Sequence, residues 1–101
     1  MNITSKRDGE LLTVYAEGKI DSTTADTAEK AIEGIRAEKG YTSIVLDFEK
    51  LQYISSAGLR IILGMQKQMN RQGGAMTVRN VSAEIMEIFD VTGFSDILTI
   101  E

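Results

Sequence analysis

The chain has 101 residues, of which 43% are hydrophobic and 26% charged, and its formal net charge is -4. These values describe one globular domain with enough apolar side chains to form a core. The chain has no cysteine and no histidine, which excludes disulfides, thiolate chemistry and imidazole as a general base. Its basic residues are scattered, whereas binding to nucleic acid needs a clustered basic face, so we expect no nucleic-acid partner.

No segment has the pattern of a signal peptide or a membrane span, because the apolar runs are only a few residues long. No linker, repeat or low-complexity segment divides the chain. We therefore expect a single domain over residues 1–101 of a cytoplasmic protein, with no membrane partner.

The first half of the chain predicts a hairpin followed by a helix. Asp8-Gly9 stands between the alternating segments Asn2–Lys6 and Leu11–Ala16, which is the favoured signal for two antiparallel strands. Farther on, Thr23 and Asp26 have the spacing of a capping box at a helix start. The apolar stripe of that helix would consist of Ala28, Ala31, Ile32 and Ile35.

A buried strand, a short polar loop and a second helix follow. Ile44–Leu46 is continuously apolar, as in a strand covered on both faces, and Asp47 stands near its carboxyl end. The helix is expected over about Ala57–Arg71, with Ser56 as its cap. Its apolar side would hold Leu59, Ile62, Leu63, Met65 and Met69. Its polar stripe, which continues backward to Ser56, would hold Arg60, Gly64, Lys67, Gln68 and Arg71.

The last third predicts a strand over Ala75–Val78, a helix capped by Ser82, and a short strand over Ile97–Ile100. Strands that alternate with helices need right-handed crossovers and a largely parallel sheet. The expected fold is therefore α/β, with a mixed, mostly parallel sheet, an N-terminal antiparallel hairpin and packed helices.

The adjacent hydroxyls of Ser55 and Ser56 form the most informative local feature. Unpaired N–H groups and a partial positive charge at a helix N-terminus accommodate a phosphate group. A serine nucleophile with Lys50 or Lys67 as base is the enzymatic alternative, but the chain lacks the Gly-x-Ser-x-Gly elbow and the serine–lysine spacing of hydrolases. We therefore expect a regulatory site and no enzyme, and we expect Asp21 to orient its loop rather than bind a metal.

The segments Ile44–Phe48 and Tyr53–Leu59 together resemble the STAS-domain anti-sigma-factor antagonists of bacteria. Members of that family carry a strand, a short loop, a phosphorylatable serine and then Gly-Leu at a helix start. Gly18–Asp21, Gly73-Gly74 and Phe89–Phe94 are similar to further family segments. The resemblance implies a single STAS-like domain with the phosphoacceptor at Ser56. Ser55, which replaces the usual aspartate, is the alternative acceptor.

The resemblance also implies a function. Such proteins bind an anti-sigma factor that is also a serine kinase and so release a sigma factor; phosphorylation blocks binding, and a serine phosphatase restores it. We expect a monomer without cofactor or metal. The implied partner-binding residues are Asp21, Ser22, Ser55, Ser56, Ala57, Gly58, Arg60, Ile61, Gly64 and Lys67. The alternative function is a ligand-sensing or scaffold STAS module that does not act on a sigma factor.

Overall fold

The computed structural model describes residues 1–101. Its elements, in chain order, are β1 (Asn2–Asp8), β2 (Leu11–Ile20), α1 (Ala25–Arg36), β3 (Ser43–Asp47), β4 (Leu51–Ile54), α2 (Ser56–Gln72), β5 (Ala75–Arg79), α3 (Ala83–Thr92), a 3-10 turn (Phe94–Asp96) and β6 (Thr99–Ile100). The predicted α/β class is confirmed. None of the helices combines the length and the apolar character that crossing a membrane requires.

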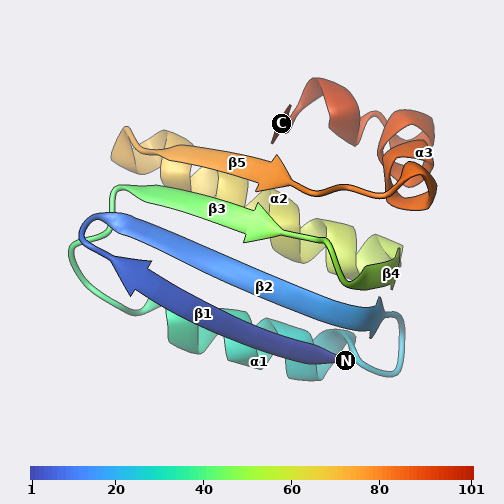
Figure 1. Ribbon diagram of the computed structural model, residues 1–101, viewed down its shortest axis with the longest axis horizontal. Coiled ribbons are helices and arrows are strands. Elements are labelled where there is room, and N and C mark those ends of the chain that lie inside the picture. The colour runs from blue at the N-terminus through green and yellow to red at the C-terminus, as the bar shows by residue number, and fades with distance from the viewer.

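The strands form one sheet in the order β1-β2-β3-β5-β6, and β4 also pairs with β2. Only the β1–β2 pair is antiparallel, as the Asp8-Gly9 hairpin predicted. Helices α1 and α2 cover one face of this sheet, and α3 lies at one end near β4 (Figure 1). The opposite face carries no helix, so the core lies between the sheet and the helices, with Ile85 and Phe89 of α3 extending it beyond α1 and α2.

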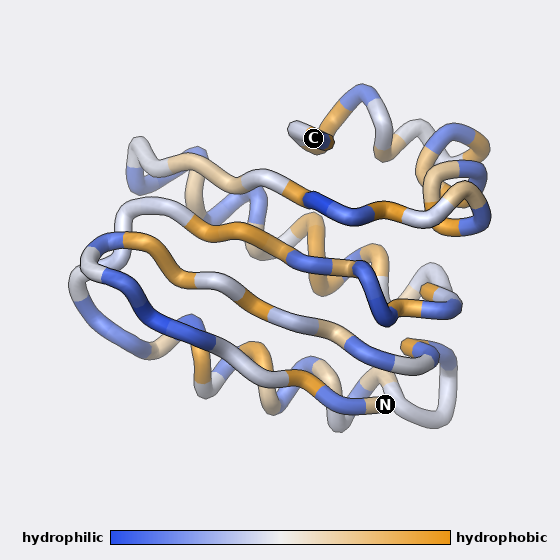
Figure 2. Tube along the Cα trace, viewed as in Figure 1, coloured by the Kyte–Doolittle hydropathy of each residue, from blue (hydrophilic) through white to orange (hydrophobic).

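The core follows from the alternation of apolar residues along the strands. Leu12, Val14 and Ala16 of β2 are buried, and Ile44 and Leu46 of β3 continue the same inward face. Hydrophobic residues accordingly concentrate on the central strands, whereas the edge strand β1 is mostly hydrophilic (Figure 2). Burial of these side chains supplies the main stabilisation of the fold.

Strand β4 was not predicted from the sequence, and the interpretation of its residues as loop is wrong. Leu51–Ile54 pairs in parallel with the end of β2, where Ile20 lies opposite Ile54. Strand β2 is correspondingly longer than predicted, since it continues past Ala16 to Ile20. A four-residue strand gives almost no periodic signal, so this pairing depends on contacts distant in the sequence.

The turn that leads into α1 also differs from the prediction. The capping box of Thr23 and Asp26 is wrong: the N-cap residue is Thr24, and its side chain forms no cap. Instead the Asp21 carboxylate accepts hydrogen bonds from the Thr23 hydroxyl (2.6 Å) and from the backbone N–H groups of Thr23 (2.9 Å) and Thr24 (3.2 Å). The Thr23 hydroxyl, followed by these N–H groups, lowers the pKa of Asp21. Asp21 thus orients its loop, as predicted.

The end of the chain is less regular than the sequence predicted. The strand expected over Ile97–Ile100 is only Thr99–Ile100, and the 3-10 turn Phe94–Asp96 precedes it. Gly93, with φ of 81°, ends α3 and starts this turn. A left-handed residue at a helix end reverses the chain, which here returns to pair with β5.

Candidate functional site

The two serines before α2 have different environments. Ser55 is the N-cap of α2: its backbone is extended and its Oγ accepts a 3.4 Å hydrogen bond from the Gly58 N–H. The prediction that Ser56 caps the helix is therefore wrong by one residue. Ser56 is the first residue of α2, is exposed, and makes no side-chain hydrogen bond. Its hydroxyl is free at the positive end of the helix dipole.

Gly58 fixes the position of this helix start from the inside. A Cβ built on Gly58 would lie 2.6 Å from Cγ1 of Ile54 and 2.8 Å from Cγ2 of Ile20. Both isoleucines are buried core residues. The absence of a side chain at Gly58 thus lets the first turn of α2 pack directly onto the ends of β2 and β4.

Pairing of β4 with β2 brings two distant segments of the predicted surface together. The backbone N–H of Ser55 donates a 2.7 Å hydrogen bond to the carbonyl oxygen of Ile20. Asp21 and the exposed Ser22 follow Ile20 directly, so they lie beside Ser55 and Ser56. The pairing of β4 with β2, which the sequence did not predict, therefore places the Asp21–Ser22 turn next to the start of α2.

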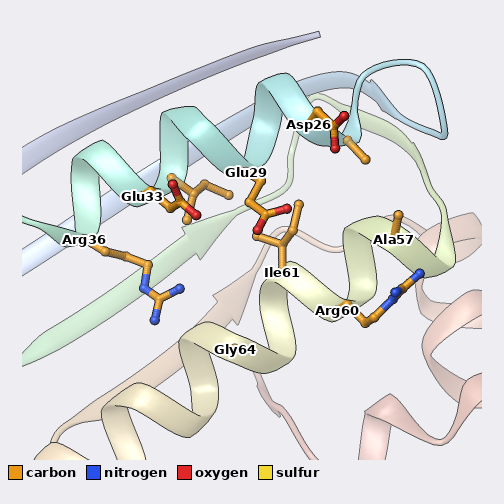
Figure 3. A pocket seen from close by; sticks show the side chains of 10 residues that line it. Asp26, Glu29, Glu33, Arg36, Ala57, Arg60, Ile61 and Gly64 are labelled. Atoms are coloured by element: carbon orange, nitrogen blue, oxygen red, sulfur yellow. The ribbon is translucent and has the colours of Figure 1, made fainter.

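A groove of about 410 Å³ runs between α1 and α2, close to the start of α2. Figure 3 shows carboxylates of α1 on one wall and residues of α2 on the other. The α2 wall includes four predicted partner-binding residues, which are Ala57, Arg60, Ile61 and Gly64. The predicted Lys67 is exposed farther along α2 and does not line the groove.

The acidic wall of the groove was missed by sequence reasoning. Asp26, Glu29 and Glu33 are exposed on α1, line the groove and form no ion pair. No group of three or more acidic residues in the chain is placed to hold a metal ion. The spacing of the three residues puts them on one helix face, but only the packing of α1 against α2 shows what that face borders.

A polar contact joins α1 and α2 at Arg36, which also lines the groove. The Arg36 Nε of α1 donates to the Gln68 Oε1 of α2, and the Gln68 Nε2 donates to the Tyr41 hydroxyl at 2.9 Å. The Arg36–Gln68 contact is the only hydrogen bond between a side chain of α1 and a side chain of α2. Gln68, predicted on the polar stripe, therefore joins the two helices.

Gly64 lies in the groove without being required by the fold. A Cβ at this position would meet only Nη1 of Arg36, at an ordinary contact distance of 3.8 Å. Glycine inside a helix costs about 1 kcal/mol relative to alanine. What it provides here is an open stretch of helix backbone within the groove.

Asp47, although near the carboxyl end of β3 as predicted, belongs to a separate cluster. It is 7% exposed and accepts hydrogen bonds from the Glu49 N–H (3.0 Å), Nδ2 of Asn80 (3.2 Å) and Nε of Arg79 (3.1 Å). Burial raises the pKa of Asp47, but these hydrogen bonds outweigh it and the net pKa is lowered. Asp47 thus ties the β3–β4 connection to the end of β5.

We expect Asp47→Asn to lower the free energy of unfolding by about 1–3 kcal/mol at pH 7, because the N–H donors around this buried carboxylate lose an ionised acceptor. A lowered folded-state pKa stabilises the protein above the unfolded-state value of about 3.9, and this contribution disappears as pH falls through the folded-state pKa. Urea unfolding should therefore show a smaller gap between wild type and variant at pH 3 than at pH 7. Asp90→Asn, at an exposed carboxylate without a partner, is the control. A gap independent of pH would contradict this role.

The sequence matches the STAS domain family model over residues 2–101. The chain belongs to the STAS domain family. It is 30% identical over 100 residues to the putative anti-sigma factor antagonist BtrV of Bordetella bronchiseptica, covering 99% of this chain and 85% of that protein. It is 28% identical to the anti-sigma-B factor antagonist of Bacillus subtilis, covering 99% and 90%. The names of these relatives denote regulatory proteins and no enzyme.

Solved structures show the same fold. The putative anti-sigma factor antagonist tm1081 of Thermotoga maritima superposes with a TM-score of 0.86 at 18% identity, covering 97% of this chain and 84% of that one. The unphosphorylated anti-sigma factor antagonist SpoIIAA superposes with a TM-score of 0.80 at 18% identity, covering 99% and 88%. The predicted STAS fold, with its mixed sheet, is confirmed.

Proposed function

We propose that this STAS domain is an anti-sigma factor antagonist that phosphorylation of Ser56 switches off. In its unphosphorylated form it binds an anti-sigma factor, which then releases its sigma factor. The serine kinase activity of that partner phosphorylates Ser56, and a phosphatase restores binding. We propose that it acts in the cytoplasm as a monomer. The observation that carries this proposal is the exposed, unbonded Ser56 hydroxyl at the first residue of α2, beside an open groove.

The local geometry favours Ser56 over Ser55 as the acceptor. A kinase needs a hydroxyl that reaches the terminal phosphate of ATP. The Ser55 side chain is half-buried and caps α2, so its phosphorylation would disturb the helix start. The Ser56 side chain needs no rearrangement to react.

The docking surface would combine the Asp21–Ser22 turn, the start of α2 and the α2 wall of the groove. Ser55, Ser56, Ala57, Arg60, Ile61 and Gly64 lie at the start of α2 or along the groove, and Lys67 extends the surface along the helix. Gly58 is buried and would support this surface from within.

Electrostatics explain how one modification would control docking. Phosphoserine adds a charge of about -1.5 to -2. At a helix N-terminus in water, that charge is stabilised by about 0.3–1 kcal/mol. Inside an interface it would be desolvated at a cost of several kcal/mol.

The comparisons support this proposal. The relatives from Bordetella and Bacillus have the names of anti-sigma factor antagonists. A further solved structure is SpoIIAA in its phosphorylated form, which superposes with a TM-score of 0.73. Similarity at 18% identity supports the fold of this chain, while the names motivate the function.

The direct test is incubation of the protein with the candidate anti-sigma factor kinase of its own organism and ATP, followed by mass spectrometry. We expect one phosphate on the peptide that contains Ser56. Ser56→Ala should abolish the modification, and Ser55→Ala should retain it. Phosphate on Ser55 would reassign the acceptor. No phosphate on either serine, with a kinase that phosphorylates its other substrates, would reject the switch.

A further inference from the structure

Arg60 differs from most arginines of the chain because its guanidinium has no partner. Arg7, Arg36 and Arg79 each donate hydrogen bonds to protein oxygen atoms. Arg60 is exposed and takes part in no ion pair and no hydrogen bond. Arg71, at the other end of α2, is free in the same way.

The position of Arg60 relative to Ser56 is fixed by the helix. The two residues are four apart on α2, so they are neighbours on one helix face. Helical side chains lean toward the N-terminus of their helix. Figure 3 shows the Arg60 side chain extending along α2 toward the first turn, where Ala57 lies, and away from Glu29 on the opposite wall.

We propose that Arg60 is the intramolecular counter-ion of phosphorylated Ser56. The planar guanidinium presents paired N–H donors that match two phosphate oxygens. Its charge is not shared with any carboxylate, so pairing with the phosphate breaks no existing contact. This inference rests on the proposed function only in taking Ser56 as the acceptor.

Such pairing would extend the effect of phosphorylation beyond one residue. In the unphosphorylated protein Arg60 is available to an acidic group of a partner at the edge of the groove. Once it binds the phosphate, that cation is no longer available, and the start of α2 carries excess negative charge instead. One modification would thus change two contacts of the docking surface.

The test needs no kinase, because phosphoserine can be placed at position 56 during translation by genetic code expansion. A 31P NMR titration then measures the pH midpoint at which the phosphate dianion takes up one proton, which is about 6 for a free phosphoserine. We expect the midpoint of the phosphorylated wild type to lie about 0.3 pH below that of phosphorylated Arg60→Gln. This twofold change in proton affinity is the size expected for an exposed pair one helical turn apart.

Arg71→Gln is the matched control, since this free arginine lies about 22 Å from Ser56 along the same helix at about 1.5 Å per residue. It should leave the midpoint unchanged, and Arg60→Lys should restore most of the effect. Equal midpoints for wild type and Arg60→Gln would overturn the proposal, as would an equal effect of Arg71→Gln. Because the phosphate is installed directly, a failure of the kinase experiment would reject the switch and leave this result intact.

Discussion

Ser56→Asp is expected to weaken binding of the anti-sigma factor more than tenfold, and phosphoserine at the same position more than a hundredfold. A net penalty of roughly 3 kcal/mol corresponds to more than a hundredfold in affinity, and an aspartate carries less charge than a phosphate. Ser56→Ala should retain the affinity of the wild type. Isothermal titration calorimetry with the purified partner measures all three proteins.

The matched control for added charge is Ser5→Asp, at an exposed serine on β1 far from α2 in the fold. It carries the same negative charge and should bind as wild type does. If Ser56→Asp and Ser56→Ala bound the partner with equal affinity, charge at this position would not control docking.

Gly58→Ala is expected to lower the free energy of unfolding by about 1–3 kcal/mol, the usual cost of overpacking a core. The added methyl group would overlap Ile54 and Ile20, which have little freedom to move. For a domain of this size the melting temperature should fall by on the order of 10 °C. Thermal unfolding followed by circular dichroism provides the measurement.

Gly34→Ala separates this packing effect from the general preference of helices for alanine. Gly34 lies in α1, and a Cβ there would meet nothing within 4 Å. The substitution should therefore stabilise the protein by up to about 1 kcal/mol. A Gly58→Ala protein as stable as wild type would mean that the start of α2 adjusts freely, which the packing argues against.

Most elements with a strong local signal were predictable from the sequence. Asp8-Gly9 located the hairpin, the apolar run at Ile44–Leu46 located the central strand, and the periodicity of α2 separated its buried face from its exposed face. The motif around Gly58 and Leu59 located the start of α2 within one residue. These features depend on neighbours in the sequence.

The features that sequence reasoning missed depend on tertiary contacts. Strand β4 exists because the end of β2 pairs with it. Ser55 rather than Ser56 caps α2 because its N–H is held by the Ile20 carbonyl group. Asp26, Glu29 and Glu33 form a groove wall only because α2 packs opposite α1. No local pattern contains these pairings.

Strand β2 pairs with β3 along its first half and with β4 along its second half. The backbone that presents Ser56 is consequently anchored to β2, the longest strand of the sheet, rather than to a mobile loop. Amide hydrogens here should exchange slowly, with Ser55 among the slow ones because its N–H is bonded to Ile20. The switch would then transmit its signal as an altered surface potential over a backbone that stays in place.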